Sequence, residues 1–251
     1  MDGDEALRSL SPWLDPRIRF SKEVTMNFGP IKLLVNQVMI PFLTFCYEHV
    51  CANYGIAIIL LTIAIKVCFI PLMRKQYESM KAMQVLNPKI KSIRDKYQKQ
   101  PEKLQKEMMA LYKAHKINPL QGCLPMIIQI PFFLAIYATI MSDTFVDIIS
   151  QPGINPGFLP FWLSNLANPD ATFILPILLA GFTYWSQKLI MVDPQQQKLL
   201  LFSPVLILVF GLKLPAGVLL YWAVSTIFST VQQLMIMKET GAPVTKVATT
   251  S

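Results

Sequence analysis

A single lysine stands inside an apolar stretch of the chain, where a positive charge is energetically expensive. Segment 54–73 is apolar except for Thr62 and Lys66, which are four residues apart and therefore share one face of a helix. A lysine placed in hydrocarbon costs at least about 2.5 kcal/mol. Two interpretations follow. Either Lys66 extends to the nearby lipid head groups and has no further role, or it faces a water-filled cavity between helices and attracts anionic groups.

Polar side chains in other apolar segments could form the walls of such a cavity. Tyr221, Ser225, Ser229 and Gln232 recur at intervals of four, four and three, which places them on one helix face. Isolated Ser, Thr and Gln residues commonly join helices by hydrogen bonds, and that role is the alternative. The length of this stripe, together with a lysine, favours a polar groove. The predicted lining consists of Lys66, Thr62, Gln129, Gln187, Tyr221, Trp222, Ser225, Ser229 and Gln232.

Residue patterns that support enzymatic catalysis are missing from the sequence. There is no HExxH, GxSxG, P-loop or GxGxxG motif. The two histidines, His49 and His115, both lie outside the predicted core spans, so a membrane-embedded serine would have no histidine base. The four cysteines form no CxxC pair. We therefore expect neither an enzyme nor a bound metal or cofactor.

The composition indicates that the elements holding these residues lie in a membrane. Hydrophobic residues make up 53% of the 251 residues, charged residues 15%, and the mean hydropathy is +0.43. A soluble domain has about 25% charged residues. The low charge also excludes a disordered chain, which needs low hydrophobicity and high net charge.

Apolar segments of about 20 residues predict transmembrane helices. One tract, 199–237, would be about 58 Å long as a single helix, nearly twice the thickness of the hydrocarbon core. Pro215 and Gly217 predict a break there, which divides the tract in two. The prediction is an all-α polytopic membrane protein with five spans, at about 54–73, 120–141, 171–191, 199–213 and 215–237, in a core that covers 53–238.

The region before the first span is more ambiguous. Segment 31–50 is apolar, but Pro41 and several polar residues interrupt it. We predict that 30–52 is an interfacial amphipathic helix, with a spanning helix as the alternative. Residues 1–29 form an N-terminal tail without the apolar core of a cleavable signal peptide, and 239–251 form a C-terminal tail.

Charge placement predicts the orientation of the spans. Segment 74–116 contains twelve basic and four acidic residues, so its net charge of +8 equals that of the whole chain. The loop 142–170 has three aspartates and no Lys or Arg. By the positive-inside rule the first segment is cytoplasmic and the second lies outside. Five spans then place the N-terminus outside and the C-terminus in the cytoplasm.

Apolar residues spaced by three and four predict two amphipathic helices within 74–117, joined by Gln98-Lys99-Gln100 into an antiparallel hairpin. One interpretation is a solvated basic loop that only sets the topology. The other is a docking arm for lipid head groups, ribosomal RNA or acidic segments of a client protein. The predicted recruitment residues are Lys81, Lys89, Lys91, Arg94, Lys96, Lys99, Lys103 and Lys106.

Several strings resemble the YidC/Oxa/Alb family of membrane protein insertases, most of all its bacterial members. They include LNPKI at 86–90, NPLQGCLP at 118–125, DPQQQ at 193–197 and LPAG at 214–217. The resemblance covers about residues 30–238. It implies five core spans, an interfacial helix, a cytoplasmic hairpin and a hydrophilic groove. The family's groove arginine aligns with Lys66, which retains the charge but lacks the planar guanidinium fork.

The resemblance also implies a function. Family members insert client membrane proteins and help them fold, without nucleotide hydrolysis, through a groove open to the cytoplasm and to lipid. The implied partners are newly made membrane proteins, membrane lipids, the ribosome and the Sec translocon. The implied location is the bacterial plasma (inner) membrane, with a thylakoid membrane as the alternative.

Two other classes of function fit a polar intramembrane stripe. A small-solute transporter or channel could use the same cavity, although the sequence shows no inverted internal repeat. A pure assembly scaffold could use the stripe as a helix-packing surface.

Overall fold

The computed structural model describes residues 29–115, 124–159, 162–190 and 202–239, and these residues are organised as helices joined by loops. The parts of the predicted elements that fall on 1–28, 116–123, 160–161, 191–201 and 240–251 lie outside the described residues. The helices are α3 Gly29–Leu34, the π-helix η2 Val35–Met39, α4 Ile40–His49, α5 Tyr54–Cys68, α6 Ile70–Lys96, α7 Pro101–Ala114, α8 Leu124–Ile140, α9 Asp143–Ile149, α10 Ile174–Ile190, α12 Phe202–Gly211 and α13 Ala216–Glu239. The predicted all-α class is confirmed.

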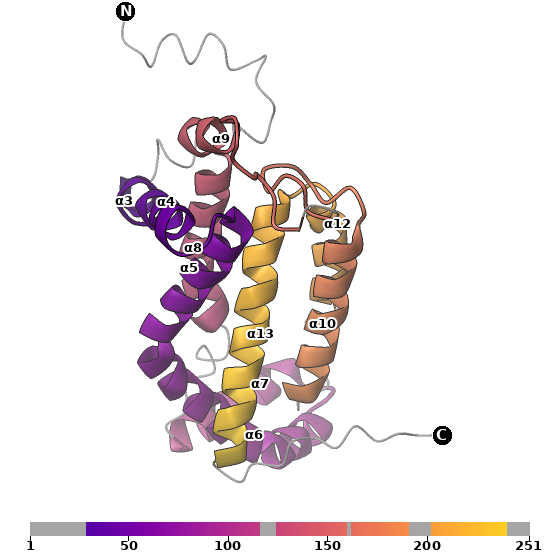
Figure 1. The fold of residues 1–251 in the computed structure, drawn as a ribbon. Helices are drawn as coiled ribbons and strands as arrows, with labels where there is room; N and C mark the ends of the chain where they lie inside the picture. Colours follow the sequence, from indigo (N-terminus) through magenta and orange to yellow (C-terminus); the bar gives the residue numbers. More distant parts are fainter. Residues whose placement is uncertain (1–28, 116–123, 160–161, 191–201, 240–251) are drawn as a thin grey trace, which may run out of the picture.

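Helix α13 stands at the centre of the bundle, with α5 and α8 on one side and α10 and α12 on the other (Figure 1). It contributes to two apolar clusters. Val218 and Tyr221 pack with buried residues of α5 and α8, whereas Leu219 packs with α10 and α12. Because alternate sides of one helix are buried against different partners, α13 joins the two halves of the bundle.

Length and apolar composition allow two stretches of the described chain to cross a membrane alone. They are 29–49, which is continuous through α3, η2 and α4, and Ala216–Ile236 of α13. Two bent helix pairs, α5 with the start of α6 and α8 with α9, raise the number to four if each pair forms one span. The count of five spans stays a prediction.

The predicted span 54–73 is divided in the structure. Helix α5 ends at Cys68, α6 begins at Ile70, and their axes differ by 61°. Pro71 has no N–H and occupies the first turn of α6, where that N–H is not needed. The first helix of the hairpin therefore starts at Ile70 rather than after residue 73, and it is continuous to Lys96.

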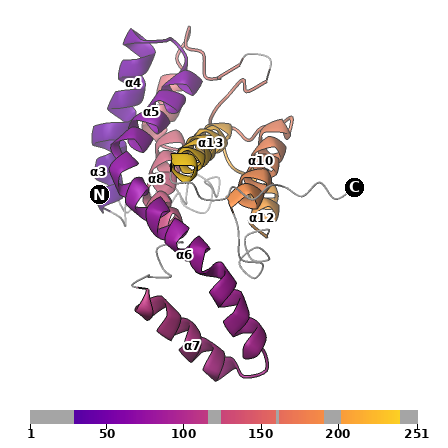
Figure 2. The ribbon, with the colours of Figure 1, turned by 90° about the horizontal axis from the view of Figure 1, so that it is seen from below.

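The stretch from α3 to α4 lies crosswise to the bundle. Figure 2 shows α4 along its length where α13 is seen nearly end-on, an orientation that favours the interfacial interpretation. Its buried side is formed by Ile31, Val35, Met39, Leu43 and Cys46. The π-helix precedes Pro41, whose ring would clash with a carbonyl one turn earlier in a regular α-helix, and the wider turn accommodates it.

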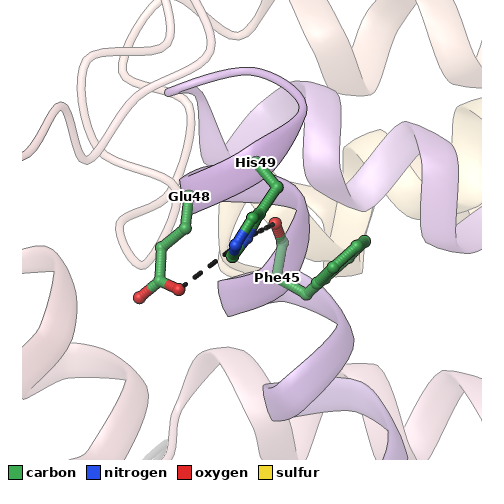
Figure 3. Close-up of polar contacts among 3 residues, drawn as sticks. All are labelled: Phe45, Glu48 and His49. Carbon is green, nitrogen blue, oxygen red and sulfur yellow. Dashed lines mark hydrogen bonds and ion pairs between the residues drawn. The ribbon is translucent and has the colours of Figure 1, made fainter.

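The end of α4 carries a small exposed polar cluster (Figure 3). The His49 ring stacks on the Phe45 ring with centroids 4.9 Å apart, and its Nδ1 lies 3.2 Å from the Phe45 carbonyl oxygen. The Glu48 carboxylate is 3.9 Å from the same nitrogen. His49 is thus engaged within its own helix, and its described contacts are with Phe45 and Glu48 rather than with predicted groove residues.

The loop that follows α9 packs over the beginnings of α5 and α13. The N–H groups of Ala216 and Gly217 donate to the carbonyls of Asn168 and Leu166 at 2.7 and 2.9 Å. These loop carbonyls satisfy N–H groups that a helix cannot pair internally. The Asn53 side chain donates to the Phe158 carbonyl at 2.9 Å. The loop therefore covers the end of the bundle where α5 and α13 begin, the end that the charge pattern predicts to lie outside.

The same loop holds a buried carboxylate in front of α10. Asp170 accepts hydrogen bonds from the Thr172 hydroxyl at 2.6 Å and from the backbone N–H groups of Leu175 and Thr172 at 2.8 and 3.0 Å. Burial alone would raise the pKa of Asp170, but the hydrogen bonds from Thr172 and Leu175 outweigh it and hold the pKa below its usual value.

We predict that Gly55→Ala weakens the closure of this end. A β-carbon at Gly55 would overlap the Phe158 side chain, so the loop must shift at a cost of about 1–3 kcal/mol. Thermal unfolding in detergent should show a lower midpoint. Gly181→Ala on α10 is the matched control, because nothing lies within 4 Å of its new β-carbon. An unchanged midpoint for Gly55→Ala would contradict the packing of the loop on α5.

We predict that Asp170 makes stability fall in acid. A carboxyl group whose folded-state pKa is lowered contributes stability above its unfolded pKa of about 3.9, and this contribution is lost as the pH drops through the folded pKa. Thermal midpoints between pH 7 and pH 3 should decline less steeply for Asp170→Asn than for the parent. Asn substitution of the exposed Asp147 should leave the slope unchanged.

Candidate functional site

Lys66 reaches from the last turn of α5 into the junction with α8 and α13. Its ammonium donates to Gln129 Oε1 at 3.1 Å and to Ser229 Oγ at 3.0 Å. The side chain is half-buried. Three helices that are distant in sequence thus meet at one cation.

Gln129 is held in place by two residues of α13. Its Nε2 donates to the Tyr221 hydroxyl, and its Oε1 accepts from Ser225 Oγ at 3.4 Å as well as from Lys66. Tyr221 and Ser225 are both buried. Because the amide nitrogen is committed to Tyr221, the amide oxygen is the end that faces the ammonium. Lys66, Gln129, Tyr221, Ser225 and Ser229 form one connected group, referred to below as the Lys66 network.

The partners of Lys66 in the described chain are neutral. Helices α5 and α8 contain no acidic residue, and the one on α13 is the terminal Glu239. An ammonium has three N–H donors, and the described contacts use two of them. Hydroxyl and amide dipoles therefore stabilise the charge without neutralising it, and one donor stays available for water or for a carboxylate.

Tyr77 of α6 adds a fourth helix to this site. Its hydroxyl donates to the Ser229 carbonyl at 3.3 Å, next to the hydroxyl that accepts from Lys66. Tyr77 is not among the predicted lining residues and lies within the predicted hairpin segment 74–117. The sequence feature that could have identified Tyr77 is its position two turns after the proline-containing start of α6. A phenol hydroxyl at that position still lies close to the membrane-spanning helices.

Four of the predicted lining residues lie outside the Lys66 network. Thr62 is fully buried and donates to the Ile58 carbonyl of its own helix at 2.7 Å. Trp222 packs edge-on against Phe133 with centroids 5.4 Å apart. Neither residue has a described contact with Lys66. Gln187 and Gln232, described next, complete this group.

Gln187 and Gln232 carry buried amide atoms without a partner among the described residues. Gln187 Nε2 donates to Ser203 Oγ of α12 at 2.6 Å, while its Oε1 has no hydrogen bond. Gln232 Nε2 likewise has none. Near Gln187, Ser186 shares a hydrogen bond of 2.7 Å with Thr230 of α13, so α10 and α13 are joined by a separate polar contact.

The basic hairpin extends away from the other helices (Figure 2). Its basic residues lie on α6 (Lys81, Lys89, Lys91, Arg94 and Lys96), between the helices (Lys99) and on α7 (Lys103 and Lys106). Lys89, Lys91, Lys96, Lys99, Lys103 and Lys106 are exposed. Leu86 and Ile90 are buried. The hairpin therefore presents a cationic surface supported by a small apolar interior.

The described residues offer no site for a metal. They contain no group of three or more His, Cys, Asp or Glu side chains that could hold an ion. The three cysteines in this part of the chain, Cys46, Cys51 and Cys68, are free thiols. The chemistry that the Lys66 network supports is electrostatic: it can attract a carboxylate into an otherwise apolar bundle.

Comparisons with known proteins show similarity to one family. Residues 45–242 match the family described as 60Kd inner membrane protein. The chain is 40% identical over 219 residues to the membrane protein insertase YidC of Syntrophus aciditrophicus, which covers 86% of this chain and 39% of that protein. It is 39% identical over 236 residues to the YidC of Helicobacter pylori, over 93% of this chain and 40% of that one. The chain thus spans about two fifths of the length of these relatives.

Among solved structures, the chain is similar in fold to a YidC structure. That structure is titled as an active YidC insertase with the first transmembrane domain resolved. The TM-score is 0.64 at 24% sequence identity, and the match covers 86% of this chain and 52% of the other.

We predict that the surroundings of the Lys66 network are hydrated. With the native cysteines replaced, Ser229→Cys should react with a water-soluble thiol reagent added on the hairpin side, because Ser229 is a half-buried residue beside Lys66 and the reactive thiolate forms only where water is present. Ile227→Cys is the control. Ile227 is 48% exposed on the same helix, so in a membrane it faces lipid and should stay unreacted. Equal labelling at both positions would contradict a hydrated site.

Proposed function

Because the chain belongs to the 60Kd inner membrane protein family, whose relatives reported above are named membrane protein insertase YidC, we propose that it inserts client proteins into a membrane and helps them fold. Insertion needs no nucleotide hydrolysis in this proposal. The observation that carries it is the Lys66 network, an ammonium within the helix bundle that is held by neutral groups.

The network addresses the main barrier to insertion. A client's hydrophilic tail must cross hydrocarbon, where each charge costs several kcal/mol. A hydrated groove that extends partway across shortens this path. Lys66 then attracts acidic residues of the tail, because opposite charges interact strongly where the dielectric constant is low. The client's apolar helix meanwhile moves along the outer faces of the bundle into lipid.

The two ends of the bundle support a direction for this process. The loop that carries Phe158 and Leu166 closes the end where α5 and α13 begin. The hairpin leaves from the opposite end, and segment 74–116 has the whole net charge of +8. We propose that the hairpin end is cytoplasmic and open to clients, with the N-terminus outside and the C-terminus inside.

The proposed location is the inner membrane of a bacterium, as the family description and the relatives' organisms suggest. Newly made membrane proteins and lipids are the proposed partners. The exposed lysines of the hairpin are proposed to recruit clients and the ribosome, and contact with the Sec translocon is proposed from the family resemblance. None of the relatives reported above is named as a transporter or channel.

We predict that the effect of Lys66 depends on the charge of the client. In vesicles reconstituted with purified protein, Lys66→Ala should slow insertion of a single-span client with an acidic tail by about tenfold or more, because hydrogen bonds to charged groups are worth about 1.5–3 kcal/mol. Lys66→Arg should retain the rate, since it keeps the cation. A client with a neutral tail should be affected much less.

Lys213→Ala is the matched control, since Lys213 is an exposed lysine in the connection before α13, away from the network. It should leave insertion unchanged. If Lys66→Ala and the parent insert the acidic client equally fast, the electrostatic part of the mechanism is wrong.

A further inference from the structure

Gln76 is the most deeply buried amide side chain among the described residues, and it has no hydrogen bond there. It lies on α6 and is 3% exposed. Both of its side-chain atoms, Nε2 and Oε1, lack a partner in the described chain. A buried polar group without a partner costs about 1–3 kcal/mol, whereas an apolar side chain of the same shape in its place would be nearly neutral or stabilising.

The surroundings of Gln76 connect it to the Lys66 network. On the same turns of α6, Met73 and Tyr77 pack against Ile236 of α13, with Ile128 of α8 alongside. Tyr77 also donates to the carbonyl of Ser229, whose hydroxyl accepts from Lys66. Gln76 is therefore the residue of the hairpin's first helix that directly precedes Tyr77, through which α6 is bonded to the network.

Helix α13 carries a second amide, Gln232, three residues after Ser229. Gln232 follows Ser225 by seven residues and Tyr221 by eleven, spacings that place all three on one helix face. That face is directed at α8, because Ser225 and Tyr221 both contact Gln129. The buried Nε2 of Gln232 also has no partner among the described residues.

The chemistry of these groups defines a ligand. A glutamine amide offers a carbonyl acceptor and N–H donors, the same pair that a peptide group offers, so one can hydrogen-bond the other at two points. It carries no charge and does not distinguish between client side chains. Every client has peptide groups, and each one that enters hydrocarbon unpaired costs several kcal/mol.

We propose that Gln76, assisted by Gln232, binds backbone peptide groups of the client's hydrophilic tail on its way to Lys66. This inference rests on the proposed function. It assigns two separate roles: Lys66 attracts carboxylates, and Gln76 satisfies the main chain of any tail, whatever its sequence.

The test compares stability with activity in Gln76→Leu, with Gln76→Met as a second apolar variant. Gln105→Leu on the exposed surface of α7 is the matched control. Thermal unfolding in detergent should give an unchanged or higher midpoint for the Gln76 variants, since they remove unpaired polar groups. Insertion into vesicles should slow by about tenfold, and by the same factor for clients with acidic and neutral tails.

A synthetic client with one backbone ester in its tail sharpens the test. The ester replaces a peptide N–H with oxygen, so it should slow insertion by the parent at the tail position that meets Gln76. In Gln76→Leu the ester should have no further effect, because the two changes remove the same contact. Scanning the ester along the tail locates that position.

Three outcomes would overturn the inference. Unchanged insertion by a Gln76→Leu protein with a raised midpoint means that Gln76 holds only water. A loss confined to acidic tails means that Gln76 acts through Lys66. If, at every tail position, the ester slows insertion by Gln76→Leu as much as insertion by the parent, the client backbone is not the ligand of Gln76. If the parent protein inserts no client in the same assay, the proposed function itself is wrong, and this result is distinct from the three above.

Discussion

A cation inside an apolar helix bundle must be surrounded by dipoles, and in this protein those dipoles come from different helices. Lys66 of α5 is held by Gln129 of α8 and by Ser229 of α13. Gln129 is in turn fixed by Tyr221 and Ser225. No described carboxylate neutralises the ammonium. The three helices must therefore keep the arrangement in which their dipoles solvate this charge.

The rest of the bundle is consistent with this requirement. Helix α13 carries the stripe on one side and packs against α10 and α12 on the other, so it cannot turn away from Lys66 without exposing Leu219 and its neighbours. The loop carbonyls at Leu166 and Asn168 hold the start of the same helix. One end of the polar stripe is thus fixed by backbone hydrogen bonds, while the other carries amides that lack described partners.

Periodicity and hydropathy in the sequence predicted the all-α class and a polar stripe on the last helix, but they predicted neither helix α9 nor the break at Phe69. They could not predict contacts between helices. Thr62 shares a helix face with Lys66, yet its hydroxyl bonds to Ile58, because a buried threonine can satisfy itself within its own helix. Tyr77 joins the site only because α5 and α6 bend at Phe69, and a length-based span from 54 to 73 conceals that bend. Which dipoles solvate Lys66 is a property of tertiary packing.

The bend at Phe69 has a mechanical consequence. Helix α6 runs for 27 residues, about 40 Å, and its base is packed against α13 through Met73 and Tyr77. A rotation of about 10° around the bend would carry the far end of α6 through about 7 Å while moving Tyr77 by less than about 2 Å. Any such tilt would displace the lysine-rich tip about four times as far as Tyr77, and the 3.3 Å hydrogen bond from the Tyr77 hydroxyl to the Ser229 carbonyl opposes it.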